Sequence, residues 1–178
     1  ITFIAFISLD YFLNYRKEKA RQAAPAAKVP LFTSAEAPVL EPVWVGGYEF
    51  ATDPSYHPGH TWAKATGPDT VLVGMDDFAR RLVGKIDKID LPTPGSWLMQ
   101  GAEGVKVETP RGKTALVSPV EGEVLRVNPL VEHDPDLASS DPFRRGWLYE
   151  IRCSNIANNF KNLLRGSLAK CTLEDAKN

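Results

Sequence analysis

Residues 105–117 read VKVETPRGKTALV, with a Pro-Arg-Gly-Lys segment between two runs rich in valine and threonine. The runs Val105–Thr109 and Thr114–Val117 have the composition of half-buried strands. Proline and glycine between two such runs indicate a tight turn. The segment therefore predicts a β-hairpin whose turn is formed by residues 110–113.

Short strands are also predicted on both sides of this hairpin. Each is a short run of β-branched or alternating apolar residues bounded by turn formers. The runs are Thr70–Gly74, Lys85–Leu91, Gly122–Val127 and Trp147–Arg152. Pro92 ends the second run, because proline has no N–H to donate to a ladder. From Trp44 onward the chain predicts a mostly β, α+β domain.

Two helices are predicted within this β pattern. Asp76 can cap a short internal helix, Asp77–Val83, which ends at Gly84. A C-terminal helix, with Ser154 or Asn155 as its N-cap, is expected to pack its apolar stripe on the sheet. That stripe consists of Ile156, Phe160, Leu163, Leu164 and Leu168. Residues 129–146 are rich in turn formers and predict a loop.

The composition indicates one globular domain with extensions. The chain has 178 residues, 43% of them apolar, which excludes a disordered chain. It carries 21 basic and 22 acidic residues, a balance that argues against a nucleic-acid module. Two cysteines and three histidines, without metal-ligand spacing, predict no metal site. Because no nucleophile triad, P-loop or dinucleotide fingerprint is present, we expect no enzymatic activity.

The N-terminal stretch predicts a membrane anchor. Residues 1–15 read ITFIAFISLDYFLNY and are followed by the basic segment RKEKARQ. We expect further residues ahead of Ile1, because fifteen are fewer than the ~20 that span a bilayer. The basic cluster places the following domain on the cytoplasmic side of the inner membrane. The alternatives are an amphipathic helix or a buried core helix.

A Pro/Ala-rich segment separates this anchor from the domain. Residues 23–43 contain four prolines, which exclude a helix or a central strand and favour an extended tether. The predicted organisation is an anchor helix at 1–22, a linker at 23–43, the domain at 44–166 and a tail at 167–178. Residues 1–28 hold five basic and two acidic residues, so their net charge of +3 is balanced by −4 in the remainder.

The order of several short motifs resembles the glycine cleavage system H protein family over about residues 56–165. The motifs are His60-Thr61-Trp62, Val73-Gly-Met-Asp-Asp-Phe-Ala79, Ser118-Pro-Val-Glu-Gly-Glu-Val124 and Gly146-Trp147-Leu148. The resemblance implies a lipoyl/biotinyl-type domain, the barrel-sandwich hybrid. It also implies that one hairpin lysine carries a lipoyl arm, which shuttles an aminomethyl group.

This chain departs from the family at that lysine. The family motif Glu-Ser-Val-Lys-Ala is matched by Glu108-Thr-Pro-Arg-Gly112, which puts Arg111 at the lysine position. Lipoylation forms an amide on a deprotonated amine, whereas a guanidinium stays protonated because its pKa lies above ~12. Arg111 therefore cannot carry the arm, and no cofactor is expected. Lys113, two residues further on, is the alternative attachment site.

The remaining cations suggest a partner surface. Arg111, Lys113, Arg144 and Arg145 can form a basic patch that binds carboxylates of a partner or an anionic lipid; otherwise they are two solvated loop tips. We expect a non-catalytic docking subunit of a larger membrane complex. The alternatives are a lipoyl carrier with its arm on Lys113, which would shuttle an aminomethyl or acyl group between enzymes, or a sensor of an acidic metabolite.

Overall fold

In a computed structural model of the chain, residues 40, 42–166 and 169 are described. The 105–117 segment forms the predicted hairpin, with strands β8 (Glu103–Thr109) and β9 (Gly112–Val117). β6 (Lys88–Asp90) pairs with the other side of β8, so the strand order of this sheet is β6-β8-β9. Only the end of the predicted run at residues 85–91 is therefore a strand.

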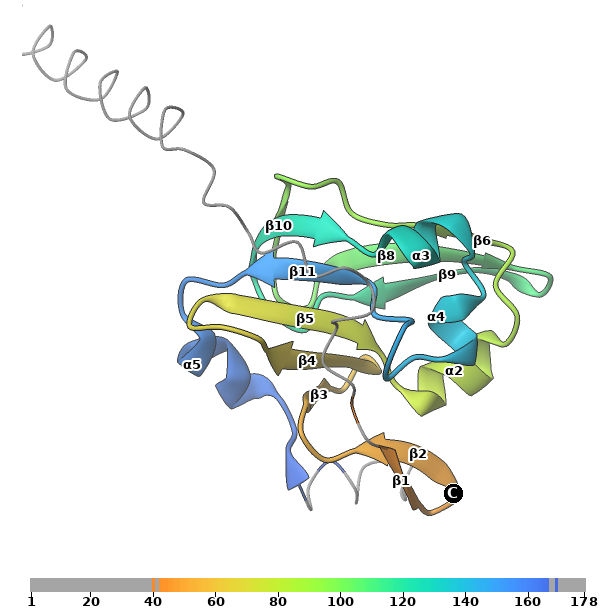
Figure 1. Cartoon of the computed structure of the whole chain (residues 1–178), viewed down its shortest axis with the longest axis horizontal. Helices are drawn as coiled ribbons and strands as arrows, with labels where there is room; N and C mark the ends of the chain where they lie inside the picture. Colours follow the sequence, from red (N-terminus) through yellow and green to blue (C-terminus); the bar gives the residue numbers. More distant parts are fainter. Residues whose placement is uncertain (1–39, 41, 167–168, 170–178) are drawn as a thin grey trace, which may run out of the picture. The chain divides into compact units, whose positions relative to one another are not determined.

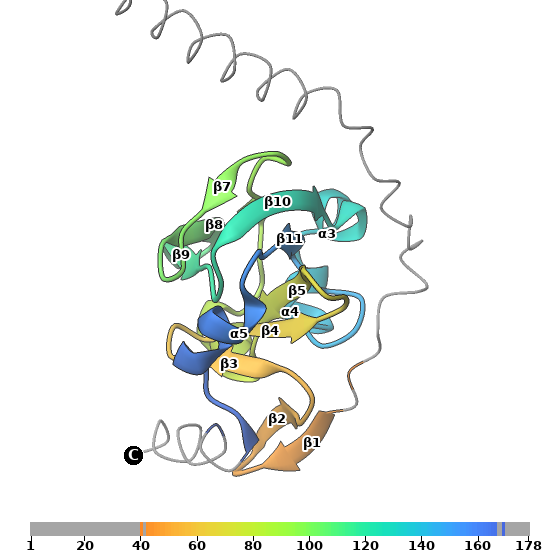
Figure 2. The ribbon, with the colours of Figure 1, turned by 90° about the vertical axis from the view of Figure 1, so that its left-hand side faces the viewer.

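A six-stranded antiparallel sheet forms the larger layer (Figure 1), in the order β3-β4-β5-β11-β10-β7. Figure 2 shows it curving from β3 to β10. The three strands predicted from runs at 70–74, 122–127 and 147–152 are confirmed with small shifts at their ends. The strands are β3 (Ser55–His57), β4 (Thr61–Ala65), β5 (Thr70–Met75), β7 (Trp97–Leu98), β10 (Gly122–Val127) and β11 (Tyr149–Arg152).

The main core contains residues of both sheets. Val73 and Ile151 of the larger sheet and Val107 of the hairpin belong to one buried cluster and are inaccessible to solvent. Leu72, the neighbour of Val73 on β5, belongs to a second cluster. Successive side chains of a strand point to opposite faces, so β5 is buried on both faces. This explains why its sequence is continuously apolar.

The second cluster reaches back into the predicted linker. A two-stranded sheet of β1 (Pro42–Val45) and β2 (Tyr48–Ala51) contributes Phe50 to it. Leu40 is only 1% exposed in the same cluster, and its backbone N–H donates to the Phe143 carbonyl at 3.3 Å. Buried packing therefore begins before Trp44, where the domain is predicted to start.

The internal helix is confirmed as α2 (Asp77–Val83), and the Asp76 carboxylate accepts the N–H of Ala79 at 2.8 Å. The predicted loop at 129–146 is wrong in part, because it contains α3 (Pro129–His133) and α4 (Leu137–Ser140). The side chain of Asn128 caps α3 at the N–H of Leu130. Proline directly after an N-cap asparagine is a helix-start signal that the turn-rich composition obscured.

The predicted C-terminal helix is confirmed at its start, where its apolar residues Ile156 and Phe160 pack on the main core, and it is wrong beyond residue 162. α5 (Ile156–Asn159), capped by Asn155, and a 3-10 turn, η1 (Phe160–Asn162), end the helical stretch before Leu163. Leu164 instead pairs with Tyr56 through two backbone hydrogen bonds of 2.8 and 2.7 Å. That pairing requires extended backbone, so a tertiary contact overrides the helical spacing of the apolar residues.

The membrane prediction concerns a different part of the chain. Within residues 40, 42–166 and 169, no helix is long and apolar enough to span a bilayer. The predicted anchor at 1–22, the linker up to residue 39 and all of the predicted tail at 167–178 except Ala169 lie outside the described residues.

Candidate functional site

The register of the hairpin places Arg111 at its tip. Thr109 pairs with Gly112, which leaves Pro110 and Arg111 as a two-residue turn. The Thr109 hydroxyl accepts the N–H of Arg111 at 3.2 Å and donates to the carbonyl of Gly112 at 3.1 Å. Arg111 is exposed. The turn is thus shorter than predicted, and Gly112 and Lys113 belong to β9.

Lys113 stands on the strand, next to a carboxylate. It lies directly opposite Glu108, and its Nζ is 2.5 Å from Glu108 Oε1. Its side chain is 78% exposed and that of Glu108 is 33% exposed. Lys113 is therefore accessible, but it lies outside the turn and its ammonium group is paired.

The tip does not fit a covalently attached lipoyl group. The turn presents a guanidinium, which cannot form the amide, and a proline, which has no amine side chain. Lys113 has the right chemistry at the wrong place in the hairpin. Arg111 forms no ion pair with the residues that the structure describes, so its charge is available to an outside group.

The other two predicted cations stand on a different loop. Arg144 Nη1 lies 3.9 Å from Asp141 Oδ1, and the backbone N–H of Arg145 donates to Asp141 Oδ2 at 3.3 Å. The Arg145 carbonyl accepts a hydrogen bond from Asn128. No ion pair or hydrogen bond links this loop to the hairpin tip within the described ranges. The structure thus brings Arg111 and Lys113 together and gives Arg144 and Arg145 neighbours of their own.

A hollow of about 170 Å³ lies beside the hairpin tip. The end of α2 lines it with Leu82 and Val83, and the hairpin lines it with Thr109 and residues 111–114. Leu82 is 68% exposed, so its side chain is open to a partner from the hollow. Sequence reasoning missed Leu82 as a site residue. The sequence held a signal for it: Leu82 directly precedes the buried Val83 on the same short helix. Adjacent helical side chains point in different directions, so one of these two apolar residues is expected to face away from the core.

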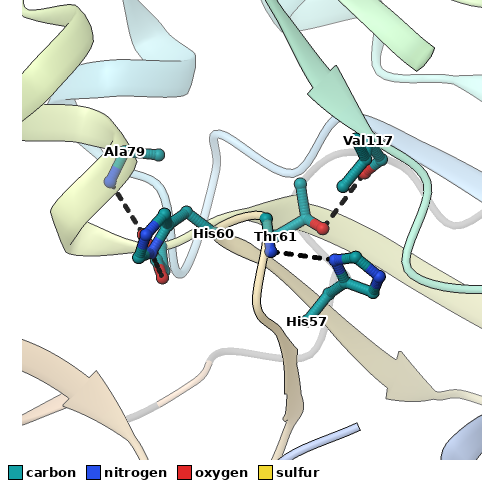
Figure 3. A network of polar contacts seen from close by, with 7 residues as sticks. His57, His60, Thr61, Ala79 and Val117 are labelled. Atoms are coloured by element: carbon teal, nitrogen blue, oxygen red, sulfur yellow. Dashed lines mark hydrogen bonds and ion pairs between the residues drawn. The ribbon is translucent and has the colours of Figure 1, made fainter. Parts of the chain in front are cut away.

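Two residues of the His60-Thr61-Trp62 motif make structural contacts, His60 at the cap of α2 and Thr61 at the end of β9 (Figure 3). His60 Nδ1 donates to the buried Asp76 carboxylate at 3.0 Å, and the Thr61 hydroxyl donates to the Val117 carbonyl at 3.1 Å. His57 accepts the N–H of Gly59, and burial lowers the pKa of the His57 imidazole. Among the described residues, no three potential metal ligands form a group.

Comparisons with known proteins agree with this architecture. A family model described as "Glycine cleavage H-protein" matches residues 55–176. A probable glycine cleavage system H protein 2 of Sulfurisphaera tokodaii is 33% identical over 117 residues, which cover 66% of this chain and 78% of that protein. A glycine cleavage system H protein of Mycobacterium avium is 37% identical over 105 residues, 59% of this chain and 80% of that protein.

The same likeness extends to three-dimensional structure. The crystal structure of a glycine cleavage system H protein from Mycobacterium marinum superposes with a TM-score of 0.62 and 26% identity, covering 71% of this chain and 99% of that one. The family model spans well over half of the chain, and the fold is mostly β with few helices, as the resemblance implied. On this evidence the chain belongs to the glycine cleavage H-protein family.

Proposed function

We propose that this chain is an H-protein-like docking subunit that carries no lipoyl group and presents its hairpin tip to a partner protein. The observation that carries the proposal is the position of Arg111 in the two-residue turn, where the family resemblance implies the lipoyl-lysine. A guanidinium keeps its proton at every physiological pH, so the swinging arm has no attachment point at the tip. The fold around the turn is nevertheless that of the family.

Loss of the arm leaves a surface that can still bind. Arg111 is exposed, and no ion pair within the described part of the chain occupies its guanidinium. Arginine is enriched at the centres of protein interfaces, and the exposed Leu82 beside it adds apolar surface that a partner can cover. These observations favour binding over group transfer.

The test is an intact-mass measurement on protein from its native host, together with treatment by a lipoate–protein ligase in vitro. We expect the native and ligase-treated proteins to keep the mass of the bare chain. The Arg111→Lys variant should gain one lipoyl group, because it restores an amine at the tip of an intact hairpin. A lipoyl adduct on the native protein would contradict the proposal.

The alternative is a lipoyl carrier with its arm on Lys113, shuttling an aminomethyl or acyl group between enzymes. It is supported by the names of the relatives, which are glycine cleavage system H proteins, and by the exposure of the Lys113 side chain. Lys113→Arg is the matched control, since it keeps the charge opposite Glu108 and removes the acylatable amine. An adduct that disappears in this variant would establish the alternative.

We further propose that residues 1–22 tether the domain to the cytoplasmic face of the inner membrane, where its partners are subunits of a membrane complex. The support is the apolar run at 1–15 with basic residues directly behind it. The native protein should stay in the membrane fraction through a high-salt wash and be released by mild detergent. Release by salt alone would contradict a spanning anchor.

A further inference from the structure

One side of the β8–β9 hairpin has no strand partner among the described residues. In the three-stranded sheet β8 is central and β9 is the edge. Residues of an antiparallel pair alternate between those that bond to each other and those whose N–H and C=O point outward. Because Thr109 and Gly112 close the turn, the next pair, Glu108 and Lys113, points outward. The Glu108 carbonyl indeed accepts the N–H of Asp87 from beyond β8, at 3.0 Å.

The same alternation shows which part of the β9 edge is open. The backbone groups of Lys113, Ala115 and Val117 face the outer side of the strand. At Val117 this side is closed, because its carbonyl accepts the Thr61 hydroxyl at 3.1 Å. At Lys113 it borders the hollow beside α2, which residues 112–114 line. The open stretch of edge is therefore the part next to the hairpin tip.

The size of the hollow limits what it can take. At about 170 Å³ it is smaller than the roughly 300–1,000 Å³ of typical small-molecule pockets. One or two side chains fit such a space better than a cofactor does. Its exposed apolar wall is Leu82, which favours an aliphatic side chain in contact with it.

The charge at the hairpin tip indicates which polar group the molecule bound in the hollow should carry. Arg111 lines the hollow without an ion pair to any described residue, whereas Lys113 is paired with Glu108. On the α2 side, Arg80 and Arg81 both pair with the buried Asp77. The hairpin tip thus carries one positive charge, on the Arg111 guanidinium, that no described carboxylate neutralises. A carboxylate of the bound molecule would complement this charge.

We propose that the free edge of β9 takes an extended peptide from a partner protein, with an aliphatic side chain on Leu82 and a carboxylate on Arg111. Main-chain bonds to Lys113 supply register and the two side chains supply selectivity, as in β-strand addition generally. The side chains of residues two apart in a strand share a face, so the sequence pattern is aliphatic-x-acidic. This inference deepens the proposed docking function and rests on it.

A titration of the isotope-labelled protein with a blocked peptide, acetyl-Ser-Leu-Thr-Asp-Ser-amide, followed by NMR, tests the proposal. Shifts are expected at the Lys113 and Ala115 amides and at the Leu82 methyls. Replacing the peptide's Asp by Asn, or Arg111→Gln in the protein, should weaken binding about two- to fivefold, as for an exposed ion pair. Arg144→Gln, on the other loop, is the matched control and should bind as the native protein does.

Methylating the backbone nitrogens of the peptide should abolish the amide shifts, because it removes the donors that strand addition needs. Absence of shifts at these residues, or equal binding of the Asp and Asn peptides, would overturn the inference. The outcome is separable from that of the mass measurement. A lipoylated protein that binds the peptide would refute the absence of the lipoyl arm and support the peptide site at the β9 edge. An unmodified protein that does not bind the peptide would support the absence of the arm and refute the peptide site.

Discussion

The base and the tip of the β8–β9 hairpin differ in burial: the base is packed in the core, whereas the tip is exposed to solvent. At the base, Val105 is buried, and the Tyr149 hydroxyl donates to Ser118 Oγ at 2.9 Å in the interior. At the tip, Arg111 and Lys113 are exposed and the turn is held by the Thr109 hydroxyl. Stability therefore depends on the base. We therefore expect the residue at the tip to change at little cost to the fold, which is compatible with arginine at the position where the resemblance implies the lipoyl-lysine.

The largest expected effect is at the base. Val105→Ala removes two buried methyl groups and leaves a cavity, which should lower the free energy of unfolding by about 2–3 kcal/mol. Chemical denaturation measures it. Lys113→Ala at the tip is the control and should stay within about 0.5 kcal/mol of the native protein. Equal losses of unfolding free energy in the two variants would contradict the idea that stability depends on the base and not on the tip.

A smaller effect is expected from the buried hydroxyl. Tyr149→Phe removes the hydrogen bond to Ser118, whose Oγ still donates to the Val120 carbonyl at 2.6 Å. The expected loss is about 1 kcal/mol, again by denaturation. Tyr48→Phe, in the two-stranded sheet, is the matched control because no hydrogen bond of its hydroxyl is found within the described residues. A loss no greater than in the control would show that the Tyr149 bond is not stabilising.

The third prediction concerns pH at the base. Burial, with a smaller contribution from His60, lowers the pKa of His57 below its usual 6.5. The folded state then binds fewer protons than the unfolded state, so the stabilisation is full above 6.5 and declines as the pH falls below it. His57→Asn keeps an acceptor for the N–H of Gly59 without titrating. Its unfolding free energy should fall less than that of the native protein between pH 7.5 and 5.5, and identical profiles would contradict the prediction.

The smallest effect is expected at the tip itself. Arg111→Gln should change the unfolding free energy by less than about 0.5 kcal/mol, since Arg111 is exposed and is given no ion pair by the described residues. The thermal midpoint should likewise match that of the native protein. A clear destabilisation would mean that Arg111 was retained for folding, which would weaken the case for a binding role.

Much of the fold follows from local sequence. The hairpin, the strand at β5 and the cap of α2 by Asp76 are each set by neighbouring residues, so periodicity and capping rules predict them. The missed helix α3 had a local start signal at Asn128 and Pro129, whereas the error at the C-terminal helix lies where a distant contact decides. Leu164 is extended because it pairs with Tyr56, and its helical spacing carries no sign of that partner.

The candidate site divides in the same way. Sequence alone predicted an arginine, Arg111, at the position where the resemblance implies the lipoyl-lysine, because the identity of a side chain and its chemistry do not depend on the fold. Only the tertiary structure decided that the turn has two residues, that Lys113 lies beside Glu108, and that Leu82 faces the same hollow as Arg111. The register of the hairpin, which the twist and length of its turn decide, brings Lys113 opposite Glu108. The packing of α2 against the hairpin brings Leu82 to the hollow, and this contact joins segments that are remote along the chain.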